Sequence, residues 1–177
     1  MNSEIKSIKN KLNEIIKKED ILDVILFGST VKGKSNPRDI DIAIISEKKI
    51  DTNTGNLRGF HFSYLNPLYF FRKRITLLNT LFREGYSLKF NKPFSELYGF
   101  RSKVMFIYEL KGLKNSKKVS FVNILRGKKG NKGLVVENGG NWLANQVFVV
   151  PINNELLFEK FFVTHGIKFM KYYLLIH

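Results

Sequence analysis

The chain has 177 residues, of which 44% are hydrophobic and 14% aromatic, so it carries enough apolar side chain for a core and is not wholly disordered. Its 30 Lys and Arg against 15 Asp and Glu give a formal charge of +15, which indicates a polyanionic partner such as nucleic acid or nucleotide phosphates rather than a membrane. The absence of cysteine excludes disulfides, thiolate nucleophiles and cysteine-based metal sites, and suits a reducing compartment.

Helical and strand patterns alternate in the first half. Apolar residues between Ile5 and Ile16 recur at helical spacing and predict an N-terminal helix, with Ser3 as a candidate N-cap. Short apolar runs predict strands at 21–27, 39–46 and 60–65, the second and third separated by a polar segment at 48–59. A long helix is expected from Asn66-Pro67 to about residue 84, where Gly85 ends it.

The second half has a weaker pattern. We expect strands at 87–94, 104–110, 146–152 and 167–176, helices at 117–125 and 153–164, and a turn at 138–140. The closing strand–helix–strand order indicates a small α+β unit. The whole chain is therefore predicted to be α+β, with a mixed β-sheet and flanking helices followed by this smaller region.

Charge also divides the chain into two regions. Residues 1–85 hold 15 basic and 10 acidic residues, a net of +5, whereas residues 86–177 hold 15 and 5, a net of +10. We expect a first module at 1–85 with carboxylate chemistry and a second at 86–177 with a basic surface.

The chain shows no targeting or membrane segment. Its first twenty residues mix charges and contain no apolar core of a signal peptide. The longest apolar runs, 21–27 and 147–152, are far shorter than the roughly 20 residues that span a bilayer. We expect a cytoplasmic protein.

The segment FGSTVKGKSNPRDIDI, residues 27–42, combines three features of a phosphate and metal site. Gly28-Ser29 stands where a strand gives way to a predicted short helix at 30–34, and free backbone N–H groups at such a point bind anions. Asp39 and Asp41 are two residues apart on a strand, so both carboxylates leave the same face. The connection can return this strand beside the first, and paired carboxylates suit Mg²⁺ that also takes phosphate oxygens.

On these residues the sequence resembles the DNA polymerase β-type nucleotidyltransferase superfamily, and most closely its minimal nucleotidyltransferase branch. The family motif, a helix-initiating GS followed some ten residues later by D-x-D, stands here as Gly28-Ser29 and Asp39-Ile40-Asp41. The resemblance covers at most residues 1–85. It implies that Asp39 and Asp41 are catalytic and ligate Mg²⁺ or Mn²⁺, and that a bound NTP loses pyrophosphate. The triphosphate would be held by Ser29 and the nearby backbone of Gly28 and Thr30. In the same loop Lys32, Lys34 and Arg38 either add phosphate contacts or are exposed loop cations.

One departure from the family concerns the third predicted strand. Members of the family place a third carboxylate there, but residues 60–65 contain no Asp or Glu. His61 and Ser63 are its polar positions and share a face. His61 either replaces the missing base or metal ligand or is a plain hydrogen-bonded residue.

The basic region leaves two hypotheses open. Residues 111–133 contain eight cations and no acid, which suits a nucleic-acid backbone; the candidate binding residues are Lys117, Lys118, Arg126, Lys128 and Lys129. Under the first hypothesis the protein transfers a nucleotidyl group to a nucleic-acid or protein acceptor. Under the second it is a catalytically inactive module of the same fold that binds RNA or DNA, or a partner subunit.

Overall fold

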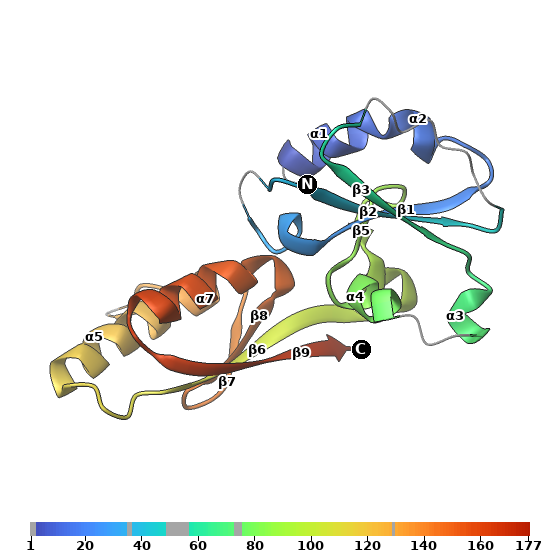
Figure 1. Cartoon of the computed structure of the whole chain (residues 1–177). Helices are drawn as coiled ribbons and strands as arrows, with labels where there is room; N and C mark the ends of the chain where they lie inside the picture. The colour runs from blue at the N-terminus through green and yellow to red at the C-terminus, as the bar shows by residue number, and fades with distance from the viewer. Residues whose placement is uncertain (1–2, 35–36, 49–56, 73–75, 129) are drawn as a thin grey trace. The chain divides into compact units, whose positions relative to one another are not determined.

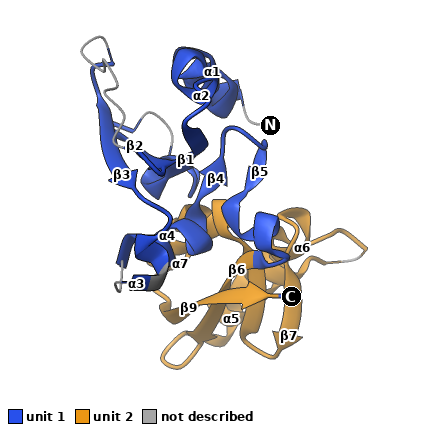
Figure 2. Ribbon diagram, turned by 90° about the vertical axis from the view of Figure 1, so that its right-hand side faces the viewer, with its two compact units in different colours: residues 1–101, 177 blue, residues 102–176 orange. Residues whose placement is uncertain are grey.

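The structure, a computed structural model, describes residues 3–34, 37–48, 57–72, 76–128 and 130–177 (Figure 1). The chain forms two compact units, residues 1–101 with 177 and residues 102–176 (Figure 2). The sequence prediction placed the boundary at residue 85. The first unit extends to 101 because β4 (Tyr86–Ser87) pairs with β1 (Ile21–Phe27) and brings the following residues into the same sheet.

The first unit is built on a five-stranded sheet with the order β3-β2-β1-β4-β5. Strand β1 is antiparallel to β2 (Ile40–Ser46), whereas β3 (Phe60–Leu65) is parallel to β2. Strands β4 and β5 (Lys92–Pro93) form an antiparallel pair at the other side of β1. The expected mixed sheet is confirmed.

Helices cover both faces of this sheet. Helices α1 (Ser3–Lys11) and α2 (Asn13–Ile16) lie on one face, where Ile8 and Leu12 pack in one buried cluster with Ile42 and Ile44. Helix α4 (Thr76–Glu84) lies on the other, where Leu81 shares a cluster with strand residues Ile25, Ala43 and Ile45. Within the helix predicted at 66–84 the structure has α3 (Tyr69–Arg72) and α4, and residues 73–75 lie outside the described residues.

The alternation of side chains along β2 determines which face of the sheet the Asp41 side chain occupies. Ile42 and Ile44 point to the α1 and α2 side, whereas Ala43 and Ile45 point to the α4 side. Because side chains alternate along a strand, Asp41 shares the α4 side with Ala43. The isoleucines anchor the strand and leave Asp41 at its beginning.

The strand predicted at 87–94 is a hairpin instead. Only Tyr86–Ser87 and Lys92–Pro93 pair, and the chain turns between them with Asn91 at φ 57°. The 3₁₀ segment η2 (Phe94–Tyr98) follows and buries Phe94. Ser87 donates a hydrogen bond of 2.8 Å to the buried carboxylate of Asp23, which fixes the start of this hairpin against β1.

The second unit has a β-α-β-β-α-β order with one additional short helix, α6 (Leu134–Glu137). Its four-stranded sheet runs β7-β8-β6-β9, so β8 separates β6 from β7 as in the split βαβ arrangement of ferredoxin-like domains. The elements are β6 (Arg101–Glu109), α5 (Asn115–Arg126), β7 (Asn141–Ala144), β8 (Val147–Pro151), α7 (Glu155–Thr164) and β9 (Lys168–Ile176). The predicted small α+β unit is confirmed, although α6 and β7 were not expected.

An aromatic core joins this sheet to its helices. Phe106 and Phe148 from the sheet lie 5.5 Å apart between ring centroids and contact Phe158 and Phe162 of α7. Phe121 of α5 belongs to the same cluster. Lys171, which is partly exposed, pairs with the buried Glu155 and with Glu159; partial burial lowers the pKa of the Lys171 ammonium, but hydrogen bonds to these carboxylates outweigh it and raise that pKa. Among the described residues no helix is long and apolar enough to cross a membrane.

Candidate active site

Asp41 lies at the centre of three neighbouring strands. In the strand register it stands opposite Phe27 of β1 on one side and opposite His61 of β3 on the other. Asp39 comes just before β2 begins at Ile40. Their side chains are 35% and 57% exposed respectively, so both carboxylates can be reached from solvent.

The Gly28-Ser29 turn lies against the Asp41 carboxylate. Gly28 has φ +79°, and a Cβ atom at this position would lie 2.6 Å from Oδ2 of Asp41. A side chain at residue 28 would therefore collide with the carboxylate and strain the backbone, so glycine meets both requirements. The structure thus brings together the two parts of the motif that lie some ten residues apart in sequence.

The turn is shorter than the helix predicted at 30–34. It forms a three-residue 3₁₀ element, η1 (Gly28–Thr30), followed by a turn in which the Lys34 amide donates to the carbonyl oxygen of Ser29. The Ser29 side chain is half-buried, whereas Thr30 is buried and its hydroxyl has no hydrogen-bond partner in the described part of the chain. Lys34 and Arg38 are exposed.

His61 stands between the two aspartates. Its Nε2 atom lies 3.9 Å from Oδ1 of Asp39, and its Nδ1 atom lies 3.8 Å from Oδ1 of Asp41. Both distances exceed a hydrogen bond, so the ring is held near the carboxylates without a direct bond to either. Strand β3 has no carboxylate, and its His61 places an imidazole beside Asp39 and Asp41.

The electrostatics of Asp41 favour a bound cation. Burial raises the pKa of its carboxyl, the imidazole of His61 lowers it, and the carboxylates of Asp39 and Glu84 raise it further. Ionised Asp41 is therefore costly in the free protein, and a cation between the carboxylates would relieve that cost.

Glu84 is a third carboxylate near this site that sequence reasoning missed. It closes α4, its side chain is only 4% exposed, and it forms an ion pair of 2.9 Å with Lys32. Nε of Arg83 lies 3.1 Å from the same carboxylate oxygen. Lys32 follows the Gly28-Ser29 turn, so this pair ties the turn to α4. A spacing signal was present, because Glu84 continues the stripe formed by Leu77 and Leu81 on the buried face of the helix.

The carboxylates of Asp39 and Asp41 and the imidazole of His61 suit a divalent cation that takes only some of its ligands from the protein. Two carboxylates and one imidazole nitrogen are close together, and oxygen ligands of this kind suit Mg²⁺ or Mn²⁺. Among the described residues no group of three or more His, Asp or Glu is already arranged to hold a metal. Mg²⁺ usually keeps several waters and takes substrate phosphates as ligands, so proteins commonly supply it with one or two carboxylates.

Comparison with known proteins agrees with this geometry. The sequence model of the family described as "Polymerase beta, Nucleotidyltransferase" matches residues 10–66, which include the turn, both aspartates and His61. Residues 10–66, called the family segment below, are therefore similar to this nucleotidyltransferase family. The match ends before α4, so Lys32 lies inside the family segment and Glu84 outside it.

Curated proteins and solved structures give little further information on function. No curated protein matches the chain. One solved structure, a tri-AMPylated HEPN toxin from Shewanella oneidensis in complex with MNT antitoxin, contains a chain that is 20% identical. The match covers 48% of this chain and 71% of that chain with a TM-score of 0.33, which is too low to support a functional argument.

The basic residues proposed from the sequence do not form one cluster. Lys117 and Lys118 lie near the start of α5, whereas Arg126 ends it, about 14 Å further along the helix axis. The Arg126 guanidinium lies 4.0 Å from the centre of the Trp142 ring and bonds to Asn145 at 3.3 Å. Lys128 is exposed in the following loop, and Lys129 lies outside the described residues.

Proposed function

We propose that the first unit is a Mg²⁺-dependent nucleotidyltransferase that moves a nucleoside monophosphate from an NTP to a nucleic-acid or protein acceptor. The observation that carries this proposal is the contact between the Gly28 turn and the Asp41 carboxylate, beside Asp39. It gives one place with backbone suited to phosphate and carboxylates suited to a cation. The family match at residues 10–66 supports the same reaction class.

The reaction assigns a task to each part of the site. An acceptor hydroxyl attacks the α-phosphorus, the bond from that phosphorus to the bridging oxygen breaks, and pyrophosphate leaves with the electron pair. Asp39 and Asp41 would hold the cation, which when bound neutralises charge on the phosphates. Ser29 and the turn backbone would bind the triphosphate, and the exposed Lys34 and Arg38 would add charge at its outer end.

His61 would accept the proton of the acceptor hydroxyl. Its ring nitrogens lie within 4 Å of both aspartates, so a hydroxyl directed at the bound phosphate would pass close to it. This assignment separates two variants. His61→Ala should reduce transfer by about 10²–10⁴-fold, the usual contribution of a positioned base. His61→Asp should retain more activity, because it restores a carboxylate opposite Asp41 in the register.

A second candidate function is a non-catalytic module of this fold that binds RNA or DNA through the second unit. The carboxylate-free β3 favours it, since no acid on that strand completes the site. In both candidates nucleic acid is a proposed partner, because residues 86–177 carry a net +10.

Label transfer distinguishes the two candidates. The full chain would be incubated with each α-³²P-labelled NTP, Mg²⁺ or Mn²⁺ and pooled RNA, then treated with nuclease or protease to locate the label. Transfer to RNA or protein that is lost in Asp39→Asn with Asp41→Asn supports the enzyme. Nucleic-acid binding that does not depend on divalent metal, without any transfer, supports the non-catalytic module.

A further inference from the structure

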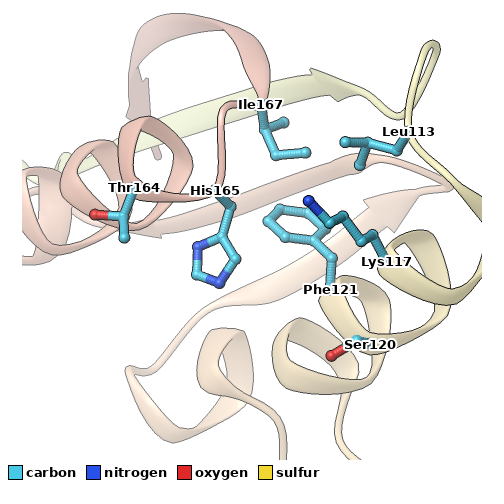
Figure 3. A pocket seen from close by; sticks show the side chains of 7 residues that line it. All are labelled: Leu113, Lys117, Ser120, Phe121, Thr164, His165 and Ile167. Atoms are coloured by element: carbon cyan, nitrogen blue, oxygen red, sulfur yellow. The ribbon is translucent and has the colours of Figure 1, made fainter.

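The second unit contains a surface groove far in sequence from the family segment. Its first cavity, of about 260 Å³, lies between α5 and the end of α7 and is lined by Leu113, Lys117, Ser120, Phe121, Thr164, His165 and Ile167 (Figure 3). A second cavity, of about 190 Å³, shares Leu113 and Ile167 with it, so the two are adjacent and are together called the groove here.

The rim of the groove is mainly cationic and its floor is apolar. Lys117 lines the first cavity, and Lys111 and Lys168 line the second, against a single acid, Glu109. The floor is formed by Phe121 and Ile167, which are 2% and 6% exposed. Phe121 is too deeply buried to stack on a base, so the accessible ring of the groove is that of the exposed His165. Cations beside an accessible ring match a ligand that has both phosphates and flat bases.

His165 adds a polar group with a defined orientation. Its Nδ1 atom lies 2.8 Å from the carbonyl oxygen of Phe161, and a carbonyl only accepts, so Nδ1 carries the proton. The neutral ring then presents Nε2 as an acceptor. The ring lies 4.3 Å from the ring of Phe161 and 5.6 Å from that of Phe121 between centroids, which fixes it beside the floor (Figure 3).

The open sheet face of this unit carries an exposed aromatic on its edge strand β9, Tyr172, which is 47% exposed. Ferredoxin-like RNA-binding domains stack bases on aromatic side chains of the open sheet face. Here Phe106 and Phe148 point into the core. On the central strands β6 and β8, the side chains that point to the opposite face of the sheet include Met105, Ile107, Val147 and Val149. Base stacking on the sheet would therefore depend on Tyr172 of the edge strand, whereas in the groove it would use the exposed ring of His165.

We propose that this groove binds single-stranded RNA, with phosphates at Lys117, Lys111 and Lys168 and a ribose hydroxyl donating to Nε2 of His165. Both cavities are smaller than the roughly 300–1,000 Å³ of pockets that enclose a small ligand, so a strand lying along the surface fits better than an engulfed nucleotide. The proposal rests on the part of the proposed function that gives nucleic acid as a partner, and not on catalysis in the first unit.

The test is fluorescence anisotropy of the full chain with 5′-labelled oligouridylate and the DNA oligomer of matched sequence. Lys117→Gln should weaken binding of both strands several-fold and make the log-affinity against log-salt slope shallower by about 0.7. His165→Phe keeps an aromatic ring but removes Nε2, so it should lower RNA affinity toward that of DNA and leave DNA binding unchanged. Lys103→Gln, on β6 and outside the groove lining, should bind both strands within about twofold of wild type.

Three results would overturn the proposal. If Lys117→Gln and His165→Phe bind both strands as wild type does, the groove is not the site, while nucleic acid remains a partner. If the wild type binds neither strand, the nucleic-acid part of the proposed function fails as well. If polyglutamate displaces oligouridylate as effectively as unlabelled RNA does, the basic surface serves an acidic protein instead. Circular dichroism of each variant confirms that it is folded.

Discussion

Replacing Lys32 by Met tests whether the ion pair with Glu84 fixes the motif turn to α4. In this variant the Glu84 carboxylate, which is 4% exposed, loses Lys32. Of the two ion pairs described above, only the one with Arg83 then remains. Removing one partner of a buried ion pair costs about 3–5 kcal/mol, because the other charge is left uncompensated. Since Arg83 lies 3.1 Å from the same oxygen and offsets part of this, we expect a loss of about 2–3 kcal/mol.

Urea unfolding followed by far-UV circular dichroism measures this loss in the free energy of unfolding. Thermal unfolding should show a melting temperature lower by roughly 5–10 °C. Lys34→Met is the matched control, because Lys34 is exposed in the same loop and its loss should change stability by no more than about 0.5 kcal/mol. Lys32→Arg should retain most of the stability. Equal stability of the Lys32→Met and Lys34→Met variants would refute the structural role of this pair.

Two further predictions concern the same site. Because burial raises the folded-state pKa of Asp41, the folded protein binds more protons than the unfolded chain as the pH rises above about 3.8, and this group makes metal-free stability fall with rising pH. Burial also raises the pKa of Asp23, so Asp41→Asn should reduce that fall without abolishing it in urea titrations with EDTA at pH 4 and 7. Gly28→Ala places a Cβ atom 2.6 Å from Oδ2 of Asp41, so calorimetry should show weakened Mg²⁺–NTP binding together with a stability loss of about 1–2 kcal/mol. Gly33→Ala, which shares the positive φ at +92°, should lose stability but keep binding; equal binding by the two variants would show that the contact with Asp41 does not matter.

The first sheet was predictable because its sequence pattern is local and consistent. Side chains alternate along β2, so the pattern alone puts Ile42 on one face of the sheet and Asp41 on the other. The polar link between β1 and β2 is short enough for β2 to pair with β1. The aspartate pair and the Gly28 turn are therefore visible in the sequence.

Glu84 and the groove residues were not visible in the same way. Glu84 continues the buried stripe of α4, but its ion pair with Lys32 depends on how α4 packs on the sheet, which local patterns do not specify. Lys117 and His165 are brought together by the packing of α5 and α7, which local patterns do not specify. The hairpin at 86–93 was also missed, because a short polar turn interrupts an apolar run that otherwise resembles one strand.

The central claim, a cation and triphosphate site made by Asp39, Asp41 and the Gly28-Ser29 turn, is tested most directly by isothermal titration calorimetry. Each NTP would be titrated with Mg²⁺ into the wild type and into the Asp39→Asn with Asp41→Asn variant. We predict binding of at least one NTP to the wild type, with affinity that falls sharply in the variant while its melting temperature holds or rises, because like-charge repulsion is removed. Unchanged affinity in the variant would contradict the metal role of the two aspartates.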